Sequence, residues 1–516
     1  MAPSCYLDLS ADGLLKVVFP FDGVTDAQLK KVRPKGTWNG VQEGWQFPLS
    51  AAQELLEQLG SRFLVTNDLA RWLQLVRHPL GPLPSHEELM VAASLDRELP
   101  DGRSLFPHQR FAVSWLLSRK AALLADEMGL GKTLTALLAS QAIVRSTDAL
   151  VMVIAPSCLH SLWTEEANAI DLPIILKSWA SLPRDLPNQE TVLIVDEAHF
   201  AQSIKANRTQ ALLRLSRHPR LRAIWLLTGT PMKNGYPSQL FPLLAAMQHP
   251  IASNKKKFHR DFVDDQHQNL LELHEATASF ILQRRKLNLI KLPPKTRIKH
   301  PVKLDSAKTL GFERRVSLAI DDYRFRVQQG LVRSETESLV LLTALRQIGA
   351  EFKLPEAYSL IKGIIDQDQS VVCFSSFVTP LILLRRRLGG ELVTGRQSIK
   401  ERDISIKRFQ SNPSSLLLTT YGSGGLGLNL MKANHVVLLE RPWTPGDVNQ
   451  AEDRCHRIGS KWPLKSHWLQ LGIADQLVDA TIEKKEKRID LFLGNRQVSI
   501  ERQSFSEMVR LCMQFL

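Results

Sequence analysis

The segment Asp126–Thr133 (DEMGLGKT) combines glycines, a lysine and a threonine at a spacing that suits phosphate binding. It follows the apolar run 121–125 and precedes a helical pattern, and glycines at such a turn let backbone N–H groups point at an anion. We expect Lys132 to reach the β- and γ-phosphates of a nucleotide and Thr133 to hold Mg²⁺ through its hydroxyl. Asp126 stands where the strict motif carries its first glycine. The expected nucleotide contacts are Asp126, Glu127, Met128, Gly129, Leu130, Gly131, Lys132 and Thr133.

An acidic motif, Asp196–His199 (DEAH), comes directly after the apolar run 191–195. The end of a strand can present carboxylates to a metal ion held by a neighbouring loop. We expect Asp196 to anchor Mg²⁺, directly or through water, and Glu197 to orient the attacking water as general base. A four-residue string alone is weak evidence, but its place after a phosphate loop and an apolar strand makes it specific.

A third motif, Leu227–Pro231 (LTGTP), again follows an apolar run. The hydroxyls of Thr228 and Thr230 could relay the state of the γ-phosphate to the rest of the lobe. The alternative is an ordinary polar turn.

The fourth motif is Gln450–Gly459 (QAEDRCHRIG). Arg454 and Arg457 are three residues apart, so on a helix they would share one face. Two guanidinium groups there could meet the nucleotide as arginine fingers, which contribute on the order of 10³ to 10⁵ in rate. The alternative is two solvated arginines on a helix surface.

These motifs need parallel sheets to position them. Apolar runs alternate with amphipathic helical patterns, which predicts βαβ units and two α/β lobes. The predicted strands are 121–125, 149–155, 191–195 and 223–227 in the first lobe, and 370–374, 415–420, 435–440 and 467–471 in the second. The intervening residues 232–369 are helix-rich and basic, with the stiff turn 292–296 inside.

The first 80 residues form a small mixed unit in this interpretation. We expect strands at 14–20 and 44–49, a short helix at 25–33, and an amphipathic helix capped by Ser50. The Pro- and Gly-rich run 78–84 then behaves as a linker.

The 516 residues suggest roughly three domains at about 150 residues each. Five widely spaced cysteines support neither a zinc ribbon nor a disulfide framework and favour a reducing intracellular compartment. The N-terminal residues lack a secretory pattern, and no apolar run approaches membrane-spanning length. The net charge of +14 suggests a polyanionic partner. It is −3 for residues 1–100, +4 for 101–240 and +13 for 241–516.

Taken in order, the motifs resemble the Swi/Snf group of superfamily two helicase-like ATPases, which are double-stranded DNA translocases. The resemblance covers about residues 101–475. It rests on Leu105–Gln109, Asp126–Thr133, Ala155–Leu159 with Trp163, Asp196–His199, Leu227–Pro231, Phe280–Lys286, Leu292–Thr296, Leu392–Gly395, Gly424–Leu430 and Gln450–Gly459. One departure is Ser460, where the family usually carries glutamine.

The resemblance implies two RecA-like lobes with ATP bound between them and duplex DNA lying across both. It implies that Gln109 reads adenine, that Gly425 and Gly427 lie near the nucleotide, and that Arg454 and Arg457 complete the site. The implied coupling residues are His199, Thr228, Thr230 and Gln450, and the implied DNA contacts are Ser157, Lys205, Arg208, Ser375 and Thr419.

The N-terminal unit resembles the small module of annealing helicases, the Swi/Snf members that rewind DNA and remodel forks. The resemblance rests on Val18–Phe21, Leu29–Lys31, Trp38–Asn39 and Trp45–Leu49. Lys30, Lys31 and Trp38 could then grip DNA by charge and stacking. The alternative is that Trp38 and Trp45 form the core of a small domain.

The expected fold class is α/β: two RecA-like parallel-sheet lobes, a helical insertion between them and a small α+β N-terminal module. The expected domains are the module (1–80), a linker (81–100), the ATP-binding lobe (101–290), a helical linker (291–369), the second lobe (370–500) and a C-terminal tail (501–516).

The expected function is an ATP-dependent double-stranded DNA translocase with ATP and Mg²⁺ as cofactors, acting in repair, fork remodelling or strand annealing. The alternatives are a remodeller of a DNA-bound protein such as RNA polymerase and an RNA-directed DEAH-type helicase. Expected partners are duplex or forked DNA, with single-stranded DNA or a DNA-bound protein as further candidates and no membrane. We expect a monomer in the cytoplasm, at the nucleoid of a bacterium or in the nucleus of a eukaryote.

Overall fold

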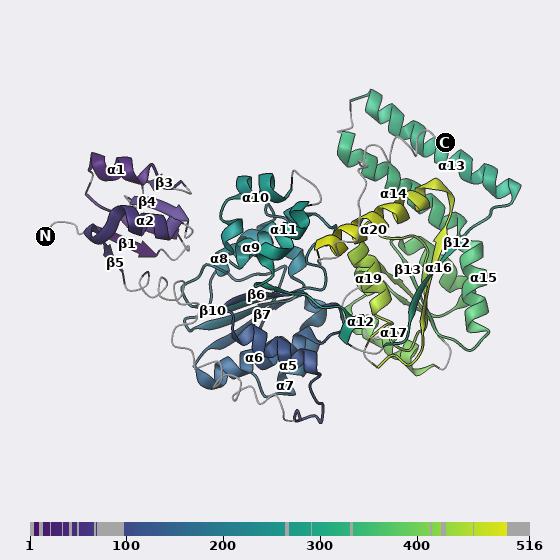
Figure 1. Cartoon of the computed structure of the whole chain (residues 1–516). Coiled ribbons are helices and arrows are strands. Elements are labelled where there is room, and N and C mark those ends of the chain that lie inside the picture. Colours follow the sequence, from purple (N-terminus) through teal and green to yellow (C-terminus); the bar gives the residue numbers. More distant parts are fainter. Residues whose placement is uncertain are drawn as a thin grey trace. The chain divides into compact units, whose positions relative to one another are not determined.

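The structure is a computed structural model that describes residues 5–9, 14–20, 22–32, 35–40, 44–48, 51–66, 69, 98–263, 268–289, 292–330, 334–412, 415–424, 430–457 and 459–492. The chain divides into two compact units (Figure 1). The first consists of Met1–Met232 with Tyr236–Arg284, and the second of Lys233–Gly235 with Arg285–Leu516.

A six-stranded sheet, parallel throughout, organises the first lobe, with strand order β11-β6-β10-β9-β7-β8. Its strands are β6 (Ala121–Leu124), β7 (Leu150–Ala155), β8 (Ile175–Ser178), β9 (Thr191–Val195), β10 (Leu221–Leu227) and β11 (Ile281–Leu282). Four of them match the predicted apolar runs. β9 and β10 are buried along their whole length, as expected for strands with both faces covered.

Helices cover both faces of this sheet (Figure 1). They are α5 (Pro107–Leu117), α6 (Lys132–Ser146), α7 (His160–Asn168), α8 (Asn207–Leu215), α9 (Phe241–Ala246), α10 (Lys255–Phe262) and α11 (Gln268–Thr277). Helix α6 is apolar around most of its circumference and is buried from Leu134 to Ile143. It therefore lies in the core, which also contains Trp163 and Trp225.

A second parallel sheet organises the other lobe, in the order β12-β17-β16-β13-β15-β14. Its strands are β12 (Lys295–Pro301), β13 (Val371–Ser375), β14 (Glu391–Val393), β15 (Leu416–Thr420), β16 (His435–Leu438) and β17 (Leu464–Gln470). Lys295 and Thr296, which we expected in a stiff turn, begin the edge strand β12 instead. Pro293 and Pro294 lack a backbone N–H, so the turn ends with them, and the residues that follow have the backbone groups needed to pair with a neighbouring strand.

The second unit contains the helices α12 (Lys286–Leu289), α13 (Ser306–Gln328), α14 (Ser334–Phe352), α15 (Leu354–Ile365), α16 (Val378–Leu388), α17 (Ile399–Ser411), α18 (Tyr421–Gly424), α19 (Pro445–Asp453) and α20 (Gly472–Phe492). One face of the sheet packs against α15 and α16 and the other against α17, α19 and α20. The long helices α13 and α14 pair around Val316, Ile320 and Leu345, which confirms the expected helical insertion (Figure 1).

The N-terminal module has a five-stranded sheet in the order β3-β4-β2-β1-β5 and a core of its own. Its elements are β1 (Tyr6–Leu9), β2 (Leu14–Val18), α1 (Gly23–Leu29), β3 (Thr37–Asn39), β4 (Gly44–Pro48), α2 (Ala52–Leu59) and β5 (Leu64–Val65). Asp22 caps α1 through both carboxylate oxygens. Ser50, the expected cap of α2, lies outside the described residues, and Ala51 occupies the cap position without a side-chain hydrogen bond.

Most of the expected linker 81–100 and all of the expected tail 501–516 lie outside the described residues. Within the described part of the chain, no helix combines the length and apolar character needed to cross a membrane.

Candidate nucleotide site

The predicted phosphate loop joins the end of β6 to the start of α6. Gly129 and Gly131 have φ of 85° and 79°, a left-handed conformation that glycine adopts without strain. Gly131 is the N-cap of α6, so the first N–H groups of a 15-residue helix face the loop. Such a helix start carries partial positive charge and suits a phosphate.

Lys132 lies within the loop rather than on its outer surface. Its Nζ donates to the carbonyl oxygens of Asp126 at 2.6 Å and Glu127 at 3.4 Å. Burial raises the pKa of Asp196, and the Lys132 ammonium partly opposes that rise, so the loop and the end of β9 influence each other electrostatically. The charge that we expect to meet the terminal phosphates is therefore already in place.

The contacts of the Asp126 side chain account for an aspartate at the position where the strict motif carries glycine. Arg284 binds its carboxylate with two donors, Nε to Oδ1 at 3.0 Å and Nη2 to Oδ2. The same guanidinium donates to the carbonyl of His108 at 2.8 Å and lies over the ring of Phe111. Because the carboxylate is held by Arg284, the expected nucleotide contact of Asp126 is limited to its backbone.

Gln109, the expected adenine reader, lies at the start of α5 against the phosphate loop. Its Oε1 accepts from the N–H of Phe106 at 3.0 Å. A Cβ placed on Gly131 would come within 2.1 Å of its Nε2, so the Gln109 side chain would have to move, and the φ of 79° at Gly131 independently favours glycine. The neighbouring His108 ring bonds the carbonyl of Leu130 at 3.1 Å.

Asp196 and Glu197 stand at the carboxyl end of β9. Asp196 accepts from Trp163 Nε1 at 2.9 Å and from the N–H of Glu197 at 2.8 Å. Burial, with the adjacent Glu197 charge, raises the pKa of Asp196 to about 6. A divalent cation would offset this cost, so a buried carboxylate here and the Thr133 hydroxyl at the start of α6 form a donor set that fits Mg²⁺.

The DEAH and LTGTP motifs meet in one chain of polar contacts. Glu197 Oε2 lies 3.1 Å from His199 Nδ1, and that nitrogen lies 3.3 Å from Thr228 Oγ1. Thr228 Oγ1 in turn accepts from the N–H of Thr230 at 3.1 Å. Gln202 fixes the turn by donating to the carbonyls of Thr230 and Pro231. Sequence reasoning missed Gln202, although it follows the acidic motif by three residues.

The two arginines of the fourth motif do not share a helix face, which corrects the helical expectation. Helix α19 ends at Asp453, Arg454 is its C-cap, and Arg457 lies in the following turns. The carbonyl of Arg454 accepts from the N–H of Leu430, and Gly459 with φ of 96° helps to turn the chain. Both arginines still belong to one short segment of the second lobe.

Ser460, the departure from the family pattern, has a structural role in that segment. Its hydroxyl accepts from the N–H of Arg457 at 3.0 Å and donates to the carbonyl of Cys455 at 3.3 Å. Arg457 Nε donates to the carbonyl of Asp453 at 3.2 Å. Burial lowers the pKa of Arg457.

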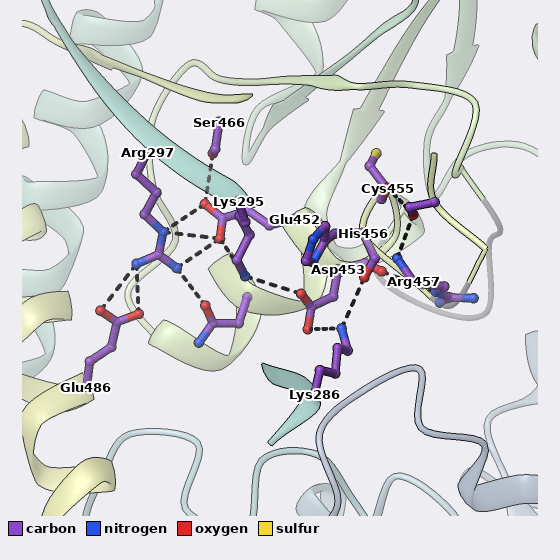
Figure 2. A network of polar contacts seen from close by, with 12 residues as sticks. Lys286, Lys295, Arg297, Glu452, Asp453, Cys455, His456, Arg457, Ser466 and Glu486 are labelled. Atoms are coloured by element: carbon purple, nitrogen blue, oxygen red, sulfur yellow. Dashed lines mark hydrogen bonds and ion pairs between the residues drawn. The ribbon is translucent and has the colours of Figure 1, made fainter. Parts of the chain in front are cut away.

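A network of charged side chains around the buried carboxylates of Glu452 and Asp453 holds the end of α19, as Figure 2 shows. Arg297 on β12 binds Glu452 through Nε at 3.0 Å and through Nη2 at 2.9 Å, and it reaches Glu486 through Nη1 at 3.0 Å. Ser466 donates to Glu452 at 2.8 Å. These contacts fix the helix that precedes the arginine segment.

Two lysines continue the network toward the arginines. Lys286 lies 3.0 Å from Asp453 and donates to the carbonyl of His456 at 3.1 Å, and Lys295 lies 3.3 Å from Asp453 (Figure 2). These cations lower the pKa of Asp453 to about 2 despite burial. Sequence reasoning did not assign this role to Lys286 or Lys295. The acidic pair Glu452 and Asp453, immediately before Arg454, was the sequence feature that could have indicated basic partners.

The remaining predicted residues fall into three groups. The side chains of Ser157, Lys205, Arg208, Lys30, Lys31 and Trp38 are exposed, and that of Gln450 is half-buried. Ser375 and Thr419 are fully buried, and Ser375 donates to Glu440 at 2.9 Å, so as placed here these two side chains contact protein. Gly425 and Gly427 lie outside the described residues.

Two domain models match the chain. The SNF2-related domain matches residues 108–177 and 173–354, and the Helicase conserved C-terminal domain matches residues 356–459. A putative ATP-dependent helicase/translocase, YwqA of Bacillus subtilis (strain 168), is 25% identical over 452 residues, covering 74% of this chain and 48% of that protein.

The DNA annealing helicase and endonuclease ZRANB3 of Homo sapiens is 27% identical over 459 residues, covering 78% of this chain and 42% of that protein. The chain thus spans about half the length of the curated relatives it matches. A solved Sulfolobus solfataricus SWI2/SNF2 ATPase core domain is 22% identical, covering 79% of this chain and 97% of that one, with a TM-score of 0.35. With both domain models matched in order along the two lobes, the chain belongs to the SWI/SNF family of helicase-like ATPases.

Proposed function

We propose that this chain hydrolyses ATP to ADP and phosphate when it binds duplex DNA, and uses the reaction to translocate along the DNA. The observation that carries the proposal is the continuous set of contacts from Glu197 through His199 to Thr228, next to a phosphate loop that fits an anion. The family relationship supports the same activity. Nucleic acid as the stimulating partner is supported by the net charge of +14.

Thr133 and Asp196 would hold Mg²⁺, which would neutralise charge at the phosphates when bound. The N–H groups at the start of α6 and the Lys132 ammonium orient the phosphates. Glu197 accepts the proton of the attacking water. His199, in contact with both Glu197 and Thr228, links the base to the LTGTP turn. Arg454 and Arg457 remain the candidates for stabilising the charge of the transferred phosphoryl group.

We further propose that the biological substrate is a repair or replication intermediate such as a fork. The N-terminal module supports this through a cluster of Lys30, Asp26, Trp45 and Trp38. Lys30 pairs with Asp26 at 2.7 Å, Asp26 accepts from Trp45 Nε1 at 3.1 Å, and the rings of Trp45 and Trp38 meet edge to face at 6.2 Å. Trp38 is 53% exposed, so it is available to stack on a base.

An ATPase assay with equal concentrations of duplex DNA, forked DNA, single-stranded DNA and RNA tests the proposal. Duplex and forked DNA should stimulate turnover most, and Lys132→Ala should abolish the stimulated rate. Equal stimulation by RNA would instead favour an RNA-directed helicase. Stimulation that requires a DNA-bound protein such as RNA polymerase would favour a protein remodeller. A triplex-displacement assay with the same DNAs then tests translocation.

A further inference from the structure

The connection between the arginine segment and β17 carries the most exposed aromatic side chain of the described residues. Trp462 is 68% exposed, compared with 53% for Trp38. It lies on the stretch of chain that continues from Arg457, which Figure 2 labels. An indole ring has a large apolar surface that usually packs in a core or at an interface. The exposed ring of Trp462 therefore offers a contact surface to a partner.

The backbone on both sides of Trp462 is fixed by hydrogen bonds. Before it, the N–H of Ser460 donates to the carbonyl of Arg457 at 2.9 Å. After it, the N–H of Leu464 donates to the carbonyl of Pro294 at 3.0 Å. The residue that follows Trp462 is a proline, which restricts the backbone of Trp462 further. Because so short a connection is held at both ends, ordering it on binding costs little additional conformational entropy.

The chain around the exposed ring is basic. Lys461 and Lys465 are both exposed, and residues 454–471 include no aspartate or glutamate. The nearest preceding carboxylates, those of Glu452 and Asp453, are buried and already bound by basic partners. The two lysines therefore add positive charge to the surface beside the ring.

The exposed Phe325 on α13 has different surroundings. The next residue, Arg326, pairs with Asp322 at 2.9 Å, so acidic and basic side chains alternate on that helix. A single exposed apolar side chain on such a surface is ordinary. The combination of an exposed ring with flanking lysines and no nearby acid in the sequence distinguishes Trp462.

Both lysines are close enough to act on a group that stacks on the indole. Lys461 adjoins Trp462, and Lys465 follows it by three residues, so the Cα atoms of Trp462 and Lys465 are at most about 11 Å apart. A nucleotide whose base stacks on the ring has its phosphates within reach of these long, flexible side chains. An aromatic platform beside basic side chains is the arrangement with which proteins hold single-stranded nucleic acid.

We propose that Trp462 is a stacking site for an unpaired DNA base, and that Lys461 and Lys465 bind the phosphates of the same strand. The faces of a paired base are covered by its neighbours in the duplex, so a side chain can stack on a base only where the base is unpaired. The site therefore engages single-stranded DNA rather than duplex. The proposal rests on the proposed function only in taking DNA as the partner.

Fluorescence anisotropy with two labelled strands tests the proposal on the full chain without ATP. One strand is oligothymidylate, and the other is an abasic strand with the same number of phosphates. Every chain carries Trp38→Ala, because Trp38 is the other exposed indole to which we assign stacking. We expect this parent to bind oligothymidylate roughly 5- to 150-fold more tightly than the abasic strand. Trp462→Leu should remove the preference, whereas Trp462→Phe, which restores an aromatic face, should keep most of it.

Three measurements separate stacking from charge and from folding. Phe325→Leu is the matched control, because it removes an aromatic ring that is 58% exposed on α13 and should leave the preference intact. Lys461→Gln combined with Lys465→Gln should weaken both strands alike and reduce the slope of log Kd against log salt concentration by about 1.4. Trp462→Leu should shift the melting temperature by less than about 2 °C, because the ring is exposed.

Equal affinity of the parent for the two strands would overturn the proposal, as would a preference that survives Trp462→Leu. If Trp462→Leu raises the Kd for ATP and leaves the preference intact, the ring serves the nucleotide instead. Duplex-stimulated ATPase of the unaltered chain, measured in parallel, tests the proposed function separately, because the anisotropy assay contains no ATP and does not depend on turnover.

Discussion

At the scale of single residues, Glu197 combines an unusual backbone with a proposed catalytic role. Its φ of 48° is uncommon for a residue with a side chain, and such conformations concentrate at functional sites. Replacing the carboxylate by an amide keeps the shape and removes the base. We therefore expect Glu197→Gln to lower the turnover rate about 10² to 10⁴-fold while the Kd for ATP stays within about threefold.

Turnover and equilibrium ATP binding, measured on the same preparation, check this prediction. The control Glu165→Gln changes an exposed carboxylate on α7 and should leave both quantities unaltered. Loss of ATP binding in Glu197→Gln would contradict the role of general base.

Asp126 is the second residue whose chemistry can be tested alone. Its carboxylate is 3% exposed and faces the Arg284 guanidinium, so Asp126→Asn leaves a largely buried charge without its counter-charge. Breaking such a pair costs about 3 to 5 kcal/mol of unfolding free energy. The control Asp101→Asn weakens an exposed pair with Arg103 and should cost under about 1 kcal/mol. Denaturant unfolding measures both free energies. Equal losses in the two variants would show that the pair of Asp126 with Arg284 contributes no more to stability than the exposed pair.

At the scale of elements, β12 carries the network that anchors α19. Arg297 faces Glu452 and Glu486, and its loss would leave the fully buried Glu452 with fewer donors. We expect Arg297→Met to lower the unfolding free energy by about 3 kcal/mol. Lys299→Met removes an exposed pair with Glu483 two residues along the same strand and should cost under about 1 kcal/mol. A smaller loss for Arg297 than for Lys299 would contradict the importance of the network.

Three neighbouring strands also carry a chain of histidines. His300 Nε2 lies 2.9 Å from His467 Nδ1, and His467 Nε2 lies 2.8 Å from His435 Nδ1. Burial is the main cause that lowers the pKa of His435 to about 4 and of His467 to about 3, from an ordinary value of 6.5. Between the lowered pKa values of the folded chain and 6.5, the unfolded chain binds more protons than the folded chain. The stability that these histidines contribute is therefore complete above pH 6.5 and declines as the pH falls toward 4.

We expect the melting temperature of the second unit to fall by roughly 5 °C between pH 7 and pH 5. His467→Gln, which cannot titrate but can still form hydrogen bonds, should reduce that fall. His259→Gln, a half-exposed histidine in the first lobe, serves as the control. Scanning calorimetry at both pH values gives the comparison, and an unchanged pH dependence in His467→Gln would contradict the assignment.

The same elements show how far sequence reasoning reached. Apolar runs predicted the central strands because such strands are buried on both faces, as β9 and β10 are. The run KTRIKHP was missed as strand β12, since its basic residues are stabilised by acidic partners on α19 and α20 that only the tertiary fold brings near. In the first lobe, Glu197, His199 and Thr228 lie in one chain of polar contacts, and their roles at a nucleotide remain predictions. The sequence did not reveal that α19 ends before Arg454, because contacts outside the helix determine where the helix ends.

At the scale of the whole molecule, charge is distributed unevenly along the chain. Residues 241–516 carry +13 of the net +14, whereas residues 1–100 carry −3. Binding by phosphate contacts weakens steeply with salt because condensed counterions are released. Affinity for duplex DNA should therefore depend strongly on salt and arise mainly from the second half of the chain. A role for the N-terminal module must rest on its local cluster instead.

That cluster gives the prediction that concerns the module as a whole. Its core, with Leu7, Leu15 and Phe47, is built from its own residues, so removing residues 1–80 should leave the cores of both lobes intact. We expect the deletion to retain duplex-stimulated ATPase and to lose its preference for forked over linear DNA. Trp38→Ala should lose part of that preference, because the exposed ring is the stacking surface. Val24→Ala, another exposed apolar side chain of the module, is the control. If fork preference survives both the deletion and Trp38→Ala, the module does not select the DNA structure, and the selection must reside in the two lobes.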